Sequence, residues 1–216
     1  MDNNILLSSV FKDGVVSKDK SGIVFTISQN LKVTITDDLY VFDTKITCIV
    51  EKNASLIYTF RGLKKSSIKE IKKDLVFVCA GQGASVVVEC LAESSLDQKF
   101  IFKTLQHHEA SDTTSRLVIK GVVHGRAVFK SENIIRIDKG IRGVVACEEN
   151  RNLLLSDHAR VITIPKLEIQ SNDISCHHGA AVSKISDDDL FYFQSRGMDQ
   201  KCAQRVLIKA FLVPDV

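Results

Sequence analysis

Short runs in which apolar and polar residues alternate recur through most of the chain. Examples are GIVFTIS (22–28), DLVFVCA (74–80) and SRLVIKGVV (115–123), all rich in Val, Ile, Thr and Phe. A period of two, carried by β-branched and aromatic residues, is typical of β-strands. Runs of the same kind occupy residues 31–36, 44–51, 54–60, 84–90, 99–105, 133–137, 142–147, 159–164 and 167–171. About a dozen short strands predict an all-β body.

The polar segments between these runs distinguish two all-β architectures. Sandwich hairpins commonly turn at Asn-Gly or Asp-Gly, yet the chain has one Asp-Gly, at Asp13-Gly14, and no Asn-Gly. Several runs are apolar at adjacent positions, which suits strands stacked around a buried interior. These features favour a β-solenoid, in which each coil covers its neighbours. No strict short repeat is present, so a sandwich or jelly roll stays open as the alternative.

The segment GLKKSSIKEIKKDL (62–75) has a different composition. It could form a short helix or a charged edge strand, and we interpret its lysines as a solvated face rather than a basic binding patch. The lysines concerned are Lys64, Lys65, Lys69, Lys72 and Lys73.

The last 30 residues change from a period of two to a helical period. Ser186 or Asp187 can cap a first helix, which the Arg-Gly pair at 196–197 ends. Asp199 can cap a second helix that stops before Pro214. The apolar positions of this second helix fall on one face, which must pack on the β body or meet a partner. These positions are Cys202, Ala203, Val206, Leu207, Ala210 and Phe211.

Composition narrows the functional classes. The 29 basic and 26 acidic residues leave a net charge of +3, too balanced to indicate a nucleic acid or a membrane as partner. No apolar run approaches the roughly 18–20 residues that span a bilayer. The start lacks the basic flank and apolar core of a signal peptide. The six cysteines form no C-x-x-C pair, so we expect free thiols in a reducing, cytoplasmic setting.

Residues 174–179, ISCHHG, gather candidate metal ligands. If this segment is a strand, Cys176 and His178 share one face and His177 points to the other. A thiolate and an imidazole can bind iron, zinc or copper, but two ligands do not close a site. The alternative is a buried cysteine beside a hydrogen-bonded histidine, and chemistry alone favours that alternative.

Two further segments resemble catalytic motifs only superficially. His108, Asp112 and Ser115 could in principle form a hydrolase triad, but no nucleophile elbow accompanies them, so loop-ordering roles are favoured. AGQGAS (80–85) lacks the Gly-Lys-Ser/Thr of a phosphate loop. We interpret it as a tight turn and expect the chain to bind no nucleotide.

Four motifs in fixed order carry a family resemblance. HHEASDTTSRLVIKGVVHGRAVF, NRNLLLSDHARVITIPKLEI, CHHGAAVSKISDDDLFYFQSRG and AQRVLIKAFL together resemble the C-terminal core of the SufB/SufD family of iron–sulfur cluster assembly proteins. The resemblance is clear over about residues 107–213. It implies a right-handed parallel β-helix over residues 1–185 and a small C-terminal α-helical subdomain over 186–216. It also implies a non-enzymatic component of an assembly complex.

The resemblance further implies partners. A SufC-type ATPase would dock on the helical subdomain, and a SufB-type paralogue, or a second copy of the chain, would meet it along the β-helix. The alternative is a structural β-helix that forms homo-oligomers without cluster-assembly activity. The residues expected to contact SufC are Leu190, Phe191, Tyr192, Arg196, Gly197, Ala203, Leu207 and Phe211.

Two positions resemble SufD rather than SufB. Asn150 stands where SufB-like chains carry a cysteine, and Gly179 stands where they carry a glutamate. His178 and Cys176 match the histidine and cysteine of the SufD pattern Cys-Ser-His-Gly-Ala. The resemblance therefore implies that His178, and more weakly Cys176, bind iron or an iron–sulfur cluster transiently at an interface. The chain departs from the family in lacking a glycine soon after Phe129 and most of the N-terminal region of longer members.

Overall fold

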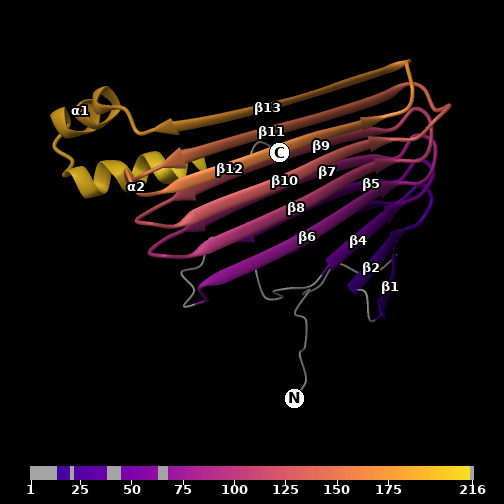
Figure 1. Ribbon diagram of the computed structural model, residues 1–216, viewed down its shortest axis with the longest axis horizontal. Coiled ribbons are helices and arrows are strands. Elements are labelled where there is room, and N and C mark those ends of the chain that lie inside the picture. The colour runs from indigo at the N-terminus through magenta and orange to yellow at the C-terminus, as the bar shows by residue number, and fades with distance from the viewer. Residues whose placement is uncertain (1–13, 20–21, 38–44, 63–67, 215–216) are drawn as a thin grey trace.

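The strands of the computed structural model form two sheets, which face each other along a solenoid (Figure 1). The structure describes residues 14–19, 22–37, 45–62 and 68–214. One sheet contains, in spatial order, β1 (Gly14–Asp19), β2 (Gly22–Ile27), β4 (Lys45–Val50), β6 (Glu70–Cys79), β8 (Lys99–His108), β10 (Val128–Ile137) and β12 (Arg160–Ile169). The other contains β13 (Ile174–Lys184), β11 (Val144–Leu154), β9 (Thr114–Val123), β7 (Ser85–Ser94), β5 (Ser55–Gly62) and β3 (Lys32–Asp37).

From β2 onward, consecutive strands alternate between the two sheets, so each coil contributes one strand to each. Apart from the antiparallel pair β1–β2, the described neighbours pair in parallel. Parallel neighbours two strands apart in sequence are the signature of a coiled chain and not of a hairpin sandwich. The predicted parallel β-helix with two C-terminal helices is therefore confirmed, and the sandwich alternative is wrong.

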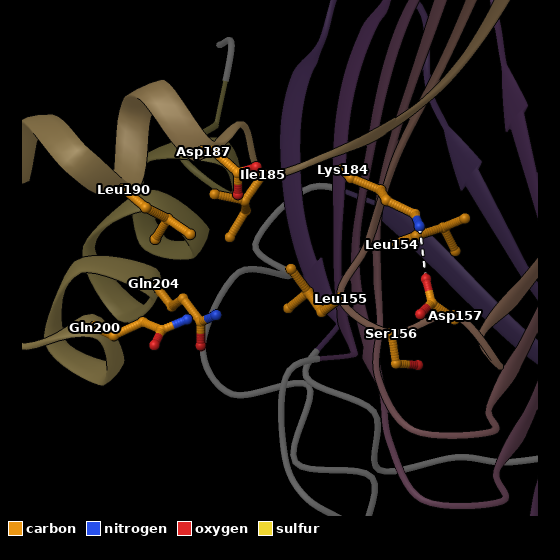
Figure 2. A pocket seen from close by; sticks show the side chains of 10 residues that line it. All are labelled: Leu154, Leu155, Ser156, Asp157, Lys184, Ile185, Asp187, Leu190, Gln200 and Gln204. Atoms are coloured by element: carbon orange, nitrogen blue, oxygen red, sulfur yellow. Dashed lines mark hydrogen bonds and ion pairs between the residues drawn. The ribbon is translucent and has the colours of Figure 1, made fainter.

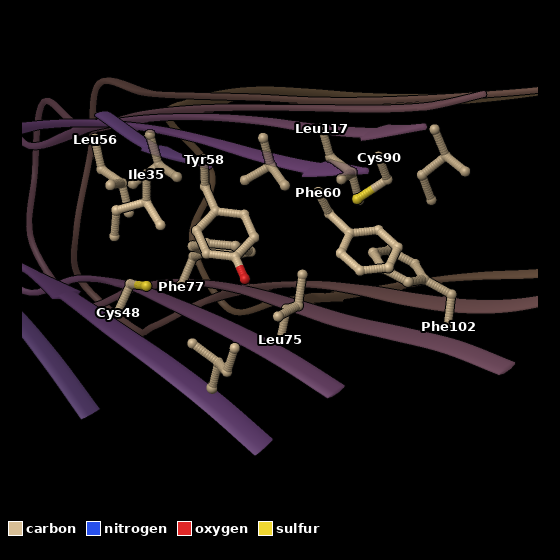
Figure 3. Packing of buried hydrophobic residues seen from close by; sticks show 14 of the residues in the cluster. Ile35, Cys48, Leu56, Tyr58, Phe60, Leu75, Phe77, Cys90, Phe102 and Leu117 are labelled. Atoms are coloured by element: carbon tan, nitrogen blue, oxygen red, sulfur yellow. The ribbon is translucent and has the colours of Figure 1, made fainter. Parts of the chain in front are cut away.

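The interior of the early and middle coils is filled with aromatic side chains (Figure 3). The Phe60 ring lies 5.9 Å from that of Phe100 and 5.8 Å from that of Phe102, while the Tyr58 and Phe77 centroids are 5.3 Å apart. Aromatic rings at these separations contribute packing beyond their buried area. The alternation in sequence predicts this core correctly because every second strand residue points inward.

From Glu70 onward the lysine-rich segment forms the first part of β6, and one of its lysines points inward. Lys72 is exposed on β6, but Lys73 is buried and its Nζ lies 2.5 Å from Asp37 Oδ2. The same ammonium group lies 5.2 Å from the Phe60 ring centroid. The prediction of a solvated face is therefore wrong at Lys73, because a carboxylate distant in sequence compensates the buried charge. Residues 63–67, including Lys64 and Lys65, lie outside the described residues.

The turn AGQGAS joins β6 to β7, as predicted. A Cβ on Gly81 would lie 2.1 Å from the backbone nitrogen of Lys52 in the turn of the coil below, and Gly83 has a φ of +74°. Only glycine fits such a close approach and such a backbone. These glycines serve the stacking of turns and not the binding of phosphate.

The solenoid ends in two strands with one free edge each: in the described part of the chain, β12 pairs only with β10, and β13 only with β11. The N–H groups of Arg160 and Gln170 donate to the carbonyls of Ala127 and Ile137, both at 3.0 Å. Amides in a parallel strand alternate between its two neighbours, so even-numbered N–H groups of β12 face β10 and odd-numbered positions face the free edge. Pro165 occupies an odd position.

Two helices follow the last strand, α1 (Asp187–Ser195) and α2 (Gln200–Phe211). The Ser186 hydroxyl accepts a hydrogen bond from the N–H of Asp189 at 3.0 Å, and the Asp199 carboxylate accepts one from the N–H of Cys202 at 2.8 Å. Both are among the predicted caps. The strands end at Lys184, while the division into subdomains at 185/186 stays a prediction. No helix among the described residues is long and apolar enough to cross a membrane.

Candidate functional site

The segment ISCHHG begins β13, the last strand of the solenoid. In the parallel register with β11, Cys176 lies opposite Ala146 and His178 opposite Glu148, both of which point into the interior. His177 lies opposite the outward-facing Cys147. The structure therefore confirms that Cys176 and His178 share the inner face and that His177 occupies the outer one.

The inner face of β13 is accessible because no further coil covers it among the described residues. His178 is exposed and has no hydrogen-bond partner in the described part of the chain, while Cys176 is half-buried. Burial raises the pKa of the Cys176 thiol, and nearby Cys147 and Glu148 add to this effect. The thiol thus favours its protonated form, and a metal ion would have to displace that proton.

Glu148 is a candidate that the sequence analysis missed. It is 1% exposed, and its Oε1 accepts a hydrogen bond from Asn133 Nδ2 at 2.7 Å. Asn133 Oδ1 in turn accepts one from Thr104 Oγ1 at 3.0 Å, so the three strands β8, β10 and β11 are linked across the interior. Glu148 Oε2 has no hydrogen-bond partner. Burial raises the pKa of the Glu148 carboxyl, while the bond from Asn133 and the charge of His178 oppose that rise.

The described residues do not complete a metal site. No three His, Cys, Asp or Glu side chains among them converge closely enough to hold an ion. Imidazole, thiol and carboxylate groups are all present around the start of β13, and all three are iron ligands in proteins. The donor chemistry fits, but further ligands would have to come from solvent or from a second chain.

The outer face at the same level presents a second row of polar residues. Arg116, Cys147 and His177 lie opposite one another on β9, β11 and β13. Burial and the charge of Glu149 raise the pKa of the Cys147 thiol, while Arg116 lowers it. The net direction is upward, so this row does not activate the thiol as a nucleophile.

His108, Asp112 and Ser115 do not form a triad. The His108 ring bonds Thr113 Oγ1 at 2.7 Å and Ser115 Oγ at 2.9 Å, and it is fully buried. Burial, with the neighbouring His107, lowers the pKa of His108 to about 4. Asp112 instead accepts a hydrogen bond from Gln82. This arrangement orders the turn, as the favoured interpretation predicted.

A pocket of about 460 Å³ separates the helices from the end of the solenoid (Figure 2). Leu190 of α1 and the amides of Gln200 and Gln204 line it from the helical side. Across from them, Lys184 Nζ lies 2.7 Å from Asp157 Oδ1. The pocket is thus lined by both apolar and amide groups.

The residues predicted to bind SufC fall into two groups. Phe191 and Tyr192 on α1 are 71% and 57% exposed, and the Arg196 guanidinium lies 5.5 Å from the Tyr192 ring centroid. Gly197, with a φ of +85°, follows in the exposed turn. Others are covered within the chain: Ala203 is fully buried, and Leu190, Leu207 and Phe211 are partly buried.

This fold and this arrangement define a β-helical core with a helical end. Residues 15–211 match the family model described as SUF system FeS cluster assembly, SufBD core domain. The chain therefore belongs to the SufB/SufD family.

Named relatives agree with that family. The chain is 30% identical over 191 residues to protein ABCI7, chloroplastic, of Arabidopsis thaliana, covering 76% of this chain and 40% of the relative. It is 34% identical over 133 residues to iron-sulfur cluster assembly protein SufD of Escherichia coli, covering 61% and 31%. A SufBD family protein of Staphylococcus epidermidis is 30% identical over 140 residues, covering 63% and 30%. The matched regions span less than half the length of these relatives.

Proposed function

We propose that the chain is a SufD-like component of an iron–sulfur cluster assembly complex, non-enzymatic by itself and active in the cytoplasm. The observation that carries this proposal is the SufBD core match over residues 15–211, combined with the uncovered inner face of β13 that presents Cys176 and His178. A scaffold requires a surface on which a second chain can complete a site, and this coil offers one.

The last coil is the proposed contact with a SufB-type paralogue or with a second copy. Its strands β12 and β13 each have a free edge in the described structure, and a free strand edge can pair with another chain. Its inner face exposes apolar side chains that a partner would cover: Leu167 is 41% exposed, Ile169 38% and Val182 52%. An exposed apolar patch with free backbone donors favours association.

The helices are the proposed contact with a SufC-type ATPase. Phe191 and Tyr192 are large aromatic side chains on α1, and both are exposed to solvent. Aromatic residues of this kind anchor many protein interfaces. The glycines of the AGQGAS turn are required for the close packing of neighbouring turns. Binding and hydrolysis of ATP would therefore belong to the partner.

Iron or a transient iron–sulfur cluster is the proposed cargo at the open coil. His178 and Cys176 would supply an imidazole nitrogen and a thiolate sulfur, and the partner would supply the remaining ligands. The incomplete ligand set is what an interface site requires, since a complete one would hold the metal permanently in one chain.

The proposal is tested by co-expression with SufB-type and SufC-type proteins. We expect a complex with both, loss of SufC when Phe191 and Tyr192 are replaced by Asp, and reduced anaerobic iron and sulfide content in His178→Ala. His177→Ala on the opposite face is the matched control and should keep its iron. Failure to co-purify with SufC, with unchanged cluster yield in His178→Ala, would contradict the proposal and favour a homo-oligomer without assembly activity.

A further inference from the structure

Glu148 differs from the other carboxylates of the described residues, because its second oxygen is buried without a hydrogen-bond partner. Its Oε1 is held by Asn133, but Oε2 is buried and has no hydrogen-bond partner. Buried carboxylate oxygens are normally paired, because an unpaired polar atom loses its hydration without compensation. An orphan oxygen in a buried, fixed side chain therefore calls for a ligand.

The neighbours of Glu148 indicate what kind of ligand its second oxygen would bind. Glu148 and His178 are register partners on neighbouring parallel strands, both on the inner face. Such strands lie about 4.8 Å apart, so the two side chains emerge side by side. Cys176 lies two residues before His178 on the same face and interacts electrostatically with Glu148. β13 lies beside this group and pairs only with β11 in the described structure, so its far edge is free.

We propose that Glu148 is a further ligand of the iron site, binding a divalent metal ion through Oε2 together with the imidazole of His178. This rests on the proposed iron site at His178 and Cys176 and adds a carboxylate to it. A divalent cation would compensate the buried negative charge, which neither Asn133 nor Thr104 can do. A carboxylate oxygen and an imidazole nitrogen are donors suited to iron(II).

The hydrogen bonds that hold Glu148 fit the role of a metal ligand better than that of a side chain that only fills the interior. Thr104 and Asn133 fix the carboxylate from two other strands, β8 and β10, as outer-sphere partners orient ligands in metal sites. The described residues do not bring three ligands together, so the site is completed only when a second chain or solvent adds to it.

Cobalt(II) titration of the full chain, alone and co-purified with its SufB-type partner, tests this assignment. Co²⁺ is a stable optical substitute for Fe²⁺: its visible bands report coordination, and a near-ultraviolet thiolate band reports Cys176. We expect Glu148→Gln, which keeps the shape and the acceptor for Asn133, to weaken the Kd for Co²⁺ by about tenfold or more. Glu149→Gln, the next residue and on the outer face, is the matched control and should stay within about twofold of the unsubstituted chain.

The variants separate this inference from the proposal beneath it. If Glu148→Gln binds Co²⁺ as tightly as the unsubstituted chain while His178→Ala does not, the assignment of Glu148 is overturned and the site at His178 stands. If neither the chain nor its complex binds Co²⁺, both are overturned, while the SufC contact is judged separately by co-purification. Thermal unfolding of each variant without metal shows whether a loss of binding reflects a loss of fold.

Discussion

The early coils and the last coils of the solenoid share one backbone plan but fill their interiors differently. Between β4 and β8 the inward positions carry Tyr58, Phe60, Phe77, Phe100 and Phe102. From the end of β8 onward the inward positions increasingly carry polar side chains, among them His108, Ser131, Asn133, Glu148, Asn150 and Asn152.

The contrast shows that a parallel solenoid does not need a uniform core. Aromatic coils gain stability from buried area, while polar coils must satisfy each buried group with a partner. In the last coils, side chains do this for one another in part: Asn150 Nδ2 donates to Ser131 Oγ at 2.7 Å, and Asn152 Nδ2 to Asn150 Oδ1 at 2.7 Å, while Glu148 Oε2 and Asn152 Oδ1 have no partner. The polar interior lies where the coil is open, so it supports a site at some cost in stability.

The largest effect is expected in the aromatic part. Replacing Phe60 with Ala removes a ring packed against two others, and we expect a loss of about 3–5 kcal/mol in the free energy of unfolding. Denaturant unfolding measures it. Phe191→Ala on exposed α1 is the control, with a change below about 0.5 kcal/mol. Equal losses in the two variants would show that the aromatic coils do not dominate stability.

The polar interior should show its own signature in the pH dependence of stability. The pKa of His108 is about 4 in the fold and about 6.5 when unfolded. Between these values the unfolded chain binds a proton that the folded chain does not, so stability falls as pH falls through this window.

The expected contribution of His108 between pH 7 and pH 4.5 is about 2–3 kcal/mol. His108→Asn should lose this contribution, so its free energy of unfolding should fall by that much less between pH 7 and pH 4.5 than in the unsubstituted chain. His158→Asn, in an exposed turn, is the control and should keep the full pH dependence. Parallel pH profiles for the chain and His108→Asn would contradict the prediction, because they would show that folding does not lower the pKa of His108.

A smaller loss is expected where one side chain, Asn133, links β10 to both β8 and β11. Asn133→Ala leaves both Glu148 Oε1 and Thr104 Oγ1 without their partner, and we expect a loss of about 1–2 kcal/mol at pH 7. Asn172→Ala in the exposed loop after β12 is the control. Urea unfolding measures both, and a neutral result for Asn133→Ala would indicate that the polar coils do not depend on this chain.

The smallest expected effect has the opposite sign. Gln106 is buried and neither its Nε2 nor its Oε1 has a hydrogen-bond partner. Gln106→Leu should stabilise the chain by about 1 kcal/mol because it removes two unpaired polar atoms. Gln98→Leu should destabilise it by a similar amount, since Gln98 bonds the backbone at both ends of its amide. A loss of stability in Gln106→Leu would indicate that a bound molecule pairs with this amide.

The sequence predicts the aromatic part better than the polar part. Alternation alone places Phe60 and Phe77 inside, because apolar residues at a period of two have no other stable place. Even in this part it does not place Lys73 of β6 inside, since the compensating Asp37 is distant in sequence and no local pattern links them. Similarly, the strand predicted at residues 142–147 stops one residue before Glu148, whereas β11 continues to Leu154. The sequence alone does not distinguish an asparagine or glutamate buried inside a coil from one exposed on a loop.

Pro165 gives the open end of the solenoid a further property. It stands at a position of β12 whose backbone nitrogen faces the free edge, so its missing N–H removes no bond to β10 and takes one donor from that edge. A strand pairing with this edge would find N–H donors before and after Pro165 but none at Pro165 itself. Such an edge cannot be copied indefinitely, so this end resists growth into a fibre and selects a partner whose own strand tolerates the gap.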